Sequence, residues 1–91
     1  MKYSLSYTNA FLRDLKRCKK RGLDENKLWE VVGKLSNGEP LDPKHRTHKL
    51  TGKRDGQWEC HIEPDWLLVW EQNDTELKLL LLNTGTHSDL F

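Results

Sequence analysis

The sequence predicts a compact two-layer α+β domain, with a mostly antiparallel sheet and a pair of helices packed on one of its faces. Segments 9–21 and 24–35, near the N-terminus, carry apolar residues at helical spacing. Segments 57–63, 66–72 and 76–83 are short, apolar and rich in strand-forming residues. A further strand precedes both helices, so the order β-α-α-β-β-β favours a layer of helices on a layer of strands.

Length and composition set the class of protein. Ninety-one residues suffice for one domain with one small core, so residues 1–91 are expected to form a single unit. With 35% hydrophobic and 32% charged residues, the chain is typical of globular proteins. Two cysteines, Cys18 and Cys60, are too few for a disulfide scaffold. No signal peptide or membrane-spanning run is evident, so a cytoplasmic location with reduced thiols and no membrane contact is expected.

The first predicted elements are a strand and a helix. Residues 2–7 alternate in polarity and are rich in strand formers. Thr8 or Asn9 can cap the helix that follows. Gly22 can end it, because glycine readily adopts the left-handed conformation common at a helix C-terminus. The apolar positions of this helix are Phe11, Leu12, Leu15 and Cys18.

The second helix is predicted to begin after Asp24, which can cap it, and to stop at residues 36–38, which are rich in turn formers. Because the link between the two helices is short, we expect an antiparallel helical hairpin. Its apolar stripe consists of Leu28, Val31, Val32 and Leu35.

Three strands are predicted in the second half of the chain, after a charged loop at 51–56. Pro64 cannot donate a ladder hydrogen bond, so it separates the first of these strands from the second. A turn at 73–74 separates the second from the third. The third is expected to lie inside the sheet, covered by helices, because it is apolar on both faces. The tail, 84–91, is expected to be turn-like.

The net charge of +1 hides an asymmetry between the two parts of the chain. Residues 1–60 carry fourteen Lys or Arg and eight Asp or Glu, a net +6, whereas residues 61–91 carry one Lys and six acids, a net −5. The basic run 16–21 is expected to form the solvated face of the first helix. Binding of a polyanion is the alternative that the same charges allow.

The stretch from Cys60 to Trp66 combines residues that suggest chemistry. In the strand before Pro64, Cys60 is expected to face the core as a small apolar side chain, whereas His61 faces the other way. The proline forces a corner that brings His61, Asp65 and Trp66 close together. A further histidine, His87, lies near the C-terminus.

Cleavage of RNA needs groups of these kinds. The ribose 2′-hydroxyl attacks the adjacent phosphorus, a base removes its proton, an acid protonates the leaving 5′-oxygen, and cations stabilise the charge on the phosphoryl oxygens. Histidine suits both proton transfers because it titrates near neutrality. No metal or other cofactor is required. The candidates for proton transfer are His48, His61, Asp65 and His87, and the candidate cations are Arg46, Lys49, Lys53 and Arg54.

Aromatic residues divide into two groups. Trp66 and Phe91 are candidates for stacking on an unpaired base, which is how proteins often hold single-stranded RNA. Phe91 has an alternative role in attaching the tail to the body. The other tryptophans are expected to pack within the fold, and His45 is expected to be solvated. These tryptophans are Trp29, Trp58 and Trp70.

A zinc site is the competing chemistry. His45, His48, Cys60 and His61 offer four ligands of suitable type. Their spacing matches no common zinc pattern, and adjacent strand residues point to opposite faces. We therefore expect no metal site.

Three segments resemble the YafQ-type toxins of the RelE/ParE superfamily of bacterial toxin–antitoxin modules. They are His48-Lys-Leu-Thr-Gly52, Cys60-His-Ile-Glu-Pro-Asp-Trp-Leu-Leu-Val-Trp-Glu71 and Thr84-Gly-Thr-His-Ser-Asp-Leu-Phe91. The resemblance extends over the whole chain and implies a RelE-like fold. It also implies a ribosome-dependent mRNA interferase that leaves a cyclic phosphate and a 5′-hydroxyl.

By resemblance, the site residues of this family fall on six positions. His87 is then expected to be the general acid and Asp65 the proton acceptor, aided by His61. His48 and His61 are expected to orient the phosphate, and Trp66 and Phe91 to frame the mRNA. Relatives usually carry an arginine just before the Thr-Gly-Thr-His segment, where this sequence has Asn83. Lys49, Lys53 or Arg54 is expected to replace that charge, unless the enzyme is weakened.

The resemblance also implies partners. A cognate antitoxin is expected to wrap the toxin with its C-terminal segment and to bind operator DNA through a ribbon-helix-helix part, in a 2:2 assembly. Two alternatives stay open: a ParE-like inhibitor of DNA gyrase on the same fold, and a catalytically weak toxin-fold protein that only co-represses its operon. The histidines around one corner argue against the first, and Asn83 keeps the second open.

Overall fold

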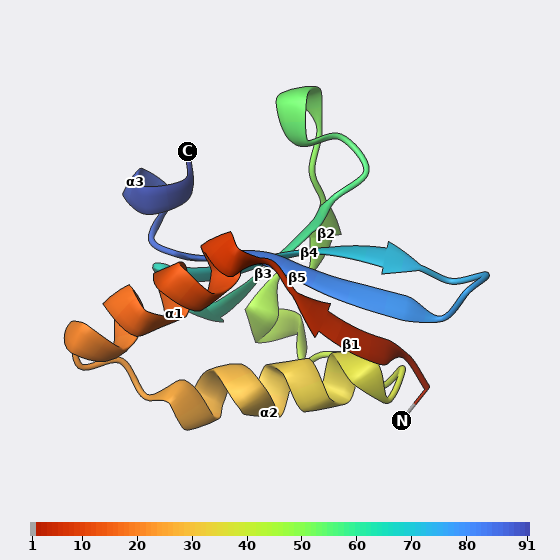
Figure 1. The fold of residues 1–91 in the computed structure, drawn as a ribbon, viewed down its shortest axis with the longest axis horizontal. Helices are drawn as coiled ribbons and strands as arrows, with labels where there is room; N and C mark the ends of the chain where they lie inside the picture. The colour runs from red at the N-terminus through yellow and green to blue at the C-terminus, as the bar shows by residue number, and fades with distance from the viewer. Residues whose placement is uncertain (1) are drawn as a thin grey trace.

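The computed structural model describes residues 2–91, which form one five-stranded sheet with two long helices packed against it (Figure 1). The α+β class and the predicted order of the first two helices and the later strands are confirmed. The elements are β1 (Ser4–Tyr7), α1 (Asn9–Lys20), α2 (Glu25–Ser36), η1 (Pro43–His45), β2 (His48–Lys49), η2 (Gly52–Arg54), β3 (Trp58–Glu63), β4 (Trp66–Asn73), β5 (Lys78–Gly85) and α3 (His87–Leu90).

The sheet is mostly antiparallel, as predicted, and its strand order is β1-β5-β4-β3-β2. The exception is β1, which pairs in parallel with β5, from Ser4 opposite Lys78 to Tyr7 opposite Leu81. As predicted, β5 lies inside the sheet, between β1 and β4. Leu77, expected in this strand, instead lies in the turn before it, with a φ of 54°.

The helix ends follow the predicted caps. The Thr8 hydroxyl accepts a hydrogen bond from the Phe11 amide at 3.0 Å, and the Asp24 carboxylate accepts one from the Asn26 amide at 3.0 Å. Gly22 follows α1 with a φ of 85°, which a residue with a side chain rarely adopts. These caps separate α1 from α2 with a short link, as the sequence predicts.

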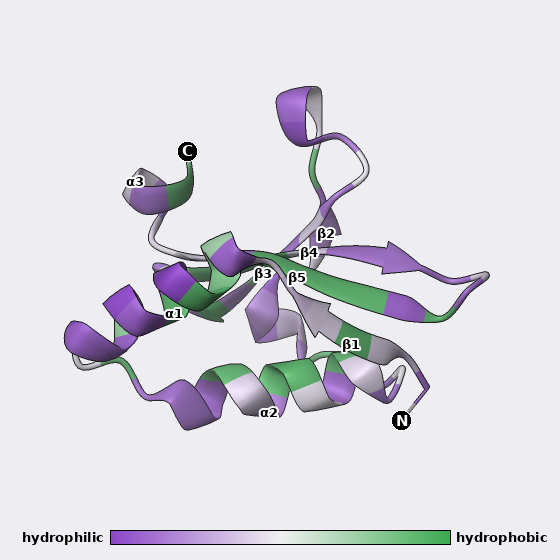
Figure 2. Ribbon diagram, viewed as in Figure 1, coloured by the Kyte–Doolittle hydropathy of each residue, from purple (hydrophilic) through white to green (hydrophobic). Residues whose placement is uncertain are grey.

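Both helices and one face of the sheet share a single core. In Figure 2 the apolar side of α2 faces the strands, and its polar side faces outward. Cys60 is fully buried in this core, as predicted, and Trp70 is buried with Trp58 stacked on it at 6.4 Å between ring centroids. The core residues of the helices are Phe11, Leu15, Cys18, Leu28, Val31, Val32 and Leu35.

α1 lies along the part of β5 that β1 does not cover. The Thr8 amide donates to the Leu81 carbonyl at 3.0 Å, and the Asp14 carboxylate accepts from the Thr84 amide at 3.2 Å. α1 therefore satisfies the backbone of this strand edge with one side chain and one capping residue. The helix thus fixes the end of β5, from which the C-terminal residues continue.

Four small elements, η1, β2, η2 and α3, were not predicted. β2 has two residues, and α3 is a single turn where the sequence indicated only turns. In Figure 1, α3 and the 50–57 loop project on the same side of the body. The basic run 16–21 is largely exposed, as expected for a solvated helix face, except that Arg17 is half-buried. Within the described chain, no helix has the length and apolar character needed to cross a bilayer.

Candidate active site

The register of the sheet aligns four residues across four strands on the face opposite the helical core. His48 pairs with Glu59, Glu59 with Val69, and Val69 with Asn83. Directly paired residues project from the same face of a sheet. Val69 is fully buried, so it forms an apolar floor between polar residues at both ends of the row.

The next row brings in the corner predicted from Pro64. His61 pairs with Leu67, and Leu67 pairs with Gly85. The register shifts between His61 and Glu63, where the strand turns toward the proline. The Nδ1 atom of His61 lies 3.1 Å from the Pro64 carbonyl oxygen. Because a carbonyl only accepts, Nδ1 carries the hydrogen, and in the neutral ring the lone pair is on Nε2.

The corner and the C-terminal turn meet at Asp65 and His87. The Asp65 Oδ1 atom accepts a hydrogen bond from the His87 amide at 3.2 Å and lies 3.4 Å from His87 Nδ1. The rings of His61 and His87 are 5.8 Å apart between centroids. The proximity of His61, Asp65 and His87, inferred from the sequence, is thus a feature of the fold. Both partners of the Asp65–His87 pair are largely exposed, so the pair orients the ring more than it stabilises the fold.

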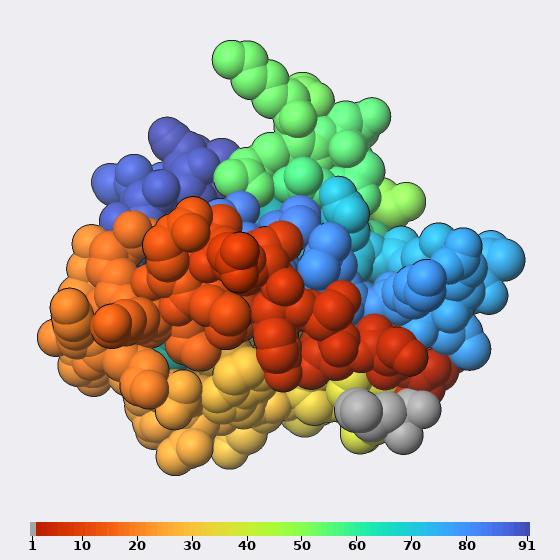
Figure 3. All heavy atoms as spheres, viewed as in Figure 1, coloured from red at the N-terminus to blue at the C-terminus, as the bar shows by residue number. Residues whose placement is uncertain are grey.

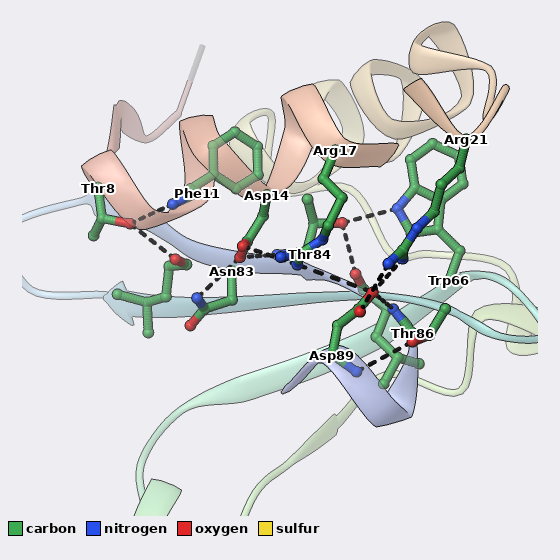
Figure 4. Close-up of polar contacts among 12 residues, drawn as sticks. Thr8, Phe11, Asp14, Arg17, Arg21, Trp66, Asn83, Thr84, Thr86 and Asp89 are labelled. Carbon is green, nitrogen blue, oxygen red and sulfur yellow. Dashed lines mark hydrogen bonds and ion pairs between the residues drawn. The ribbon is translucent and has the colours of Figure 1, made fainter. Parts of the chain in front are cut away.

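α3, which carries His87, is attached to α1 through Asp89. Arg21 donates to the Asp89 carboxylate at 2.6 and 3.2 Å, and the Thr86 amide donates to it at 2.9 Å (Figure 4). The Arg21 guanidinium and the Thr86 amide hold the pKa of the Asp89 carboxyl well below its usual range. Asp89 and Thr86 also form a capping box. One carboxylate therefore starts this short helix and ties it to the body.

Glu59 is a site residue that the sequence reasoning missed. It is only 4% exposed, and its Oε1 atom lies 3.3 Å from His48 Nε2 and 3.9 Å from His61 Nε2. His48 Nδ1 is 2.7 Å from the Arg46 carbonyl and so carries a hydrogen. The Glu59 carboxylate therefore lies within reach of two imidazole rings. The strand alternation that places Glu59 on the face of His61 was the available signal.

The predicted cations differ in their surroundings. Arg54 is half-buried, and its guanidinium lies over the ring of Phe91, 5.3 Å from its centroid. Lys49 lies over the ring of Trp58 at 5.3 Å, and Lys53 is exposed at the loop tip. Phe91 itself is 59% exposed and 6.1 Å from the His87 ring between centroids. Arg54 is therefore connected to the His87 turn through an aromatic ring.

Trp66 does not have the surroundings that a base platform needs. It is 1% exposed and belongs to the core, and its Nε1–H donates to the Thr84 hydroxyl at 2.9 Å (Figure 4). The prediction that Trp66 stacks on a base is therefore wrong for this conformation. The first residue of β4 faces the helices, and the indole packs where the sequence suggested an open corner. The Thr84 hydroxyl in turn donates a hydrogen bond to the Leu67 carbonyl at 2.7 Å.

His45 also differs from its prediction. It is only 9% exposed, and its Nδ1 atom lies 2.6 Å from the His61 carbonyl oxygen. The η1 turn places it against the outer edge of β3, where it satisfies a backbone group that no strand pairs with. The prediction that His45 is solvated is wrong, because the short turn that buries it cannot be recognised from hydropathy.

Asn83 is held at both ends of its amide. Its Nδ2 donates to the Asp14 carboxylate at 3.0 Å, and its Oδ1 accepts from both terminal nitrogens of Arg54 at 3.3 and 3.4 Å. Asn83 is thus next to one of the three cations expected to replace an arginine at this position. Lys49 and Lys53 make no hydrogen bond to Asn83 among the residues described.

The four ligands considered for zinc do not converge. Cys60 is in the core, and His45 is turned to a backbone carbonyl. In residues 2–91, no group of three or more His, Cys, Asp or Glu side chains is arranged to hold a metal ion. These four residues therefore do not form the zinc site that their types suggested.

Comparison with known proteins agrees with the fold. Residues 3–91 match the family described as the bacterial toxin of type II toxin–antitoxin system, YafQ. The mRNA interferase toxin YafQ of Escherichia coli strain K12 is 35% identical over 88 residues, which cover 96% of this chain and 94% of that protein.

Two solved structures have the same fold. A metal-bound toxin from Helicobacter pylori has a TM-score of 0.91 and 39% identity over 98% of this chain and 99% of its own. YafQ in the Escherichia coli DinJ–YafQ complex has a TM-score of 0.88 and 34% identity over 98% of both chains. Since the family match spans nearly the whole chain, this protein belongs to the YafQ family of bacterial toxins of type II toxin–antitoxin systems.

Proposed function

We propose that this protein is an mRNA interferase, an endoribonuclease that acts as the toxin of its module. The observation that carries the proposal is the neighbouring pair of imidazoles, His61 and His87, with ring centroids 5.8 Å apart. Each ring has a carboxylate beside it, Glu59 at one and Asp65 at the other. Two histidines this close can both reach one phosphate, one as proton acceptor and the other as proton donor.

The proposed reaction needs two proton transfers and no added reactant. The 2′-hydroxyl oxygen bonds to phosphorus while an acceptor removes its proton. The bond from phosphorus to the 5′-oxygen breaks, and a donor protonates that oxygen. The products are a 2′,3′-cyclic phosphate and a 5′-hydroxyl.

His87 is proposed as the proton donor. The Asp65 carboxylate lies on its Nδ1 side and accepts the backbone N–H of the same residue, so it both orients the ring and stabilises the imidazolium. Nε2 is then the atom that gives its proton to the 5′-oxygen. This arrangement makes Asp65 a positioning residue in the proposal, rather than the acceptor that the family resemblance implies.

His61 is proposed as the proton acceptor. Its Nδ1–H is directed at the Pro64 carbonyl, so the neutral ring has its lone pair on Nε2, on the side of Glu59. An imidazole is a better acceptor near neutral pH than an ordinary carboxylate. After the transfer, Glu59 stabilises the imidazolium, and His48, whose Nε2 lies 3.3 Å from the same carboxylate oxygen, helps to hold Glu59 in place.

The proposed substrate is mRNA in the decoding site of the ribosome. The exposed ring of Phe91 offers a platform for an unpaired base, and Lys49 and Lys53 add positive charge at the rim. The proposed partner is a cognate antitoxin that contacts operator DNA. Toxin and antitoxin are proposed to form the 2:2 assembly expected from the family. The DinJ–YafQ complex of Escherichia coli is a precedent for such a partner.

Mapping of 5′ ends in cellular transcripts tests the activity. Wild-type protein and His87→Ala are induced at matched levels, and new ends within coding regions are counted by frame and codon. We expect such ends with the wild type only, together with growth arrest. Arrest that persists in His87→Ala with intact mRNA would overturn the proposal and favour gyrase inhibition instead.

The ribosome requirement has its own test. Purified protein is added to the same mRNA free in solution and engaged on translating ribosomes. Cleavage confined to the ribosome-bound mRNA is expected, because the site has few groups that bind parts of the RNA other than the scissile phosphate. Equal cleavage of both forms would contradict ribosome dependence but not endonuclease activity.

A further inference from the structure

Arg54 carries a positive charge that no acidic residue neutralises. Its guanidinium contacts the Gln57 side-chain oxygen at 3.0 Å, the Asn83 side-chain oxygen, and the face of Phe91. Among residues 2–91 it forms no ion pair, whereas Arg17 and Arg21 are paired with carboxylates. A half-buried guanidinium held by neutral groups retains its full charge and its bidentate donors for an anion.

Asn83 fixes the orientation of Arg54. The Asp14 carboxylate accepts hydrogen bonds from Asn83 Nδ2 at 3.0 Å and from the Thr84 amide at 3.2 Å, and Arg17 binds its other oxygen at 3.1 Å (Figure 4). Because a carboxylate only accepts, the amide nitrogen of Asn83 must face Asp14. The amide oxygen is therefore left for Arg54.

An arginine at position 83 and the present position of Arg54 exclude one another. An arginine side chain has no acceptor for Arg54, and it would put a second positive charge beside the first. Asp14 would still be available to hold such an arginine in place of the amide. The site thus has room for one fixed cation at the Asn83 end of the row, supplied either from β5 or from the 50–57 loop.

The loop delivers this cation next to the proposed proton donor. Arg54 lies on one side of Phe91, 5.3 Å from its ring centroid, and the same ring is 6.1 Å from that of His87. In Figure 3 the loop and the C-terminal residues rise side by side above the body. A groove of about 280 Å³ opens between them, lined by Leu50, Thr51, Lys53, Arg54, Leu90 and Phe91.

We propose that Arg54, and not residue 83, binds the non-bridging oxygens of the scissile phosphate, and that Asn83 acts as its positioning residue. The inference rests on the mRNA cleavage proposed above. It assigns to the 50–57 loop the charge that the family resemblance places at position 83. Lys49 and Lys53, the other two candidates, then serve only the rim.

A double-mutant cycle tests the assignment. Wild type, Arg54→Gln, Asn83→Arg and the double variant are compared by the single-turnover rate of cleavage of ribosome-bound mRNA. Arg54→Gln is expected to cleave about 10²-fold more slowly, as for loss of a charged donor at the transition state. Asn83→Arg is expected to restore at least about tenfold in the Arg54→Gln background, since one cation then occupies the place of the other. In the wild-type background it is expected to give no comparable gain.

Controls separate this role from a structural one. Arg54→Lys keeps the charge but loses the planar guanidinium that can donate two hydrogen bonds to one anion, so an intermediate rate is expected. Lys78→Gln removes a charge at the far hairpin, where Lys78 pairs with Glu76, and the rate is expected to be unchanged. Asn83→Ala removes the acceptor of Arg54 and should lower the rate less than Arg54→Gln does. Melting temperatures identify any variant that fails to fold, and in that case Arg54→Lys takes the place of Arg54→Gln in the cycle.

The failure of this inference differs from the failure of the proposed function. If the wild type cleaves and His87→Ala does not, an Arg54→Gln rate within about threefold of the wild type overturns the role of Arg54 alone. A double variant no faster than Arg54→Gln overturns the exchange of positions. If the wild type itself leaves ribosome-bound mRNA intact, the proposed function fails, and this inference fails with it.

Discussion

Arg21, the residue that ends α1, binds both carboxylate oxygens of Asp89 on α3, at 2.6 and 3.2 Å, although 68 residues separate them in the sequence. This contact fixes the turn that carries His87 and Phe91 against the body of the fold. The geometry of the site thus depends on a residue that has no part in the proposed chemistry.

Asp89→Asn is expected to change the dependence of stability on pH. The pKa of Asp89 is lowered in the folded protein, chiefly by Arg21, so the folded state binds fewer protons than the unfolded state in acid. This contribution to the free energy of unfolding is complete above the unfolded-state pKa of about 3.9 and is lost as pH falls below it. Urea unfolding from neutral pH to about pH 3 should show a steeper loss for wild type than for Asp89→Asn. Parallel curves would contradict this; Glu30→Gln, on the exposed side of α2, is the control.

Gly85→Ala should disturb the same connection from the other side. Gly85 has a φ of 157°, and a Cβ atom there would lie 2.8 Å from Asp89 Oδ2. We expect a loss of about 1–3 kcal/mol in the free energy of unfolding and a larger relative loss of cleavage, because His87 moves with α3. Gly33→Ala in α2 is the matched control, since its Cβ meets nothing within 4 Å. That variant should gain about 0.5–1 kcal/mol.

Glu59→Gln should slow cleavage by about 10–10²-fold, because His61 loses the carboxylate that stabilises its protonated form. The protein should stay folded, since glutamine has the size of glutamate and keeps a polar group beside His48. Glu63→Gln is the control: Glu63 lies on the same strand but pairs with Lys27, away from His61. Equal rates for Glu59→Gln and Glu63→Gln would remove Glu59 from the proposed mechanism.

Trp66→Phe and Phe91→Leu should affect different properties, the first the stability of the fold and the second the rate of cleavage. Trp66→Phe keeps an aromatic ring but leaves the Thr84 hydroxyl without its hydrogen-bond donor. The free energy of unfolding should fall by about 1–3 kcal/mol. Cleavage by the folded fraction should be nearly unchanged. Phe91→Leu should leave stability nearly unchanged and lower cleavage, because an exposed platform is lost. Chemical denaturation and single-turnover cleavage measure the two effects separately. A cleavage defect in Trp66→Phe at full folding would restore it as a substrate contact.

Both cysteines should resist modification in the folded protein. Burial raises the pKa of the Cys60 thiol to about 12, and burial also raises that of Cys18. A thiol-specific reagent at mildly alkaline pH should label neither without denaturant and both in urea. Rapid labelling of the native protein would show that the core opens more readily than its packing indicates.

The sequence by itself determined the elements and the polarity of their faces. The caps at Thr8 and Asp24, the corner at Pro64 and the core position of Cys60 all follow from local propensity and alternation, and the structure agrees with each. The meeting of His61, Asp65 and His87 was also expected, because the proline corner and the motif resemblance pointed to it. The caps, the corner and the alternation depend on neighbours along the chain, which a sequence displays directly. The approach of His87 to Asp65, 22 residues away, was expected from the motif resemblance and not from local pattern.

Only the tertiary structure decided which groups share the site and which leave it. The pairing of β3 with β2 put Glu59 beside His48. The first residue of β4, Trp66, points into the core, and the η1 turn buries His45. Likewise, the contact of Arg54 with Asn83 joins a loop to a strand 29 residues away. These relationships depend on strand register and on how short turns close over a sheet edge. A shift of one residue in register would reverse the faces, so local pattern alone does not fix them.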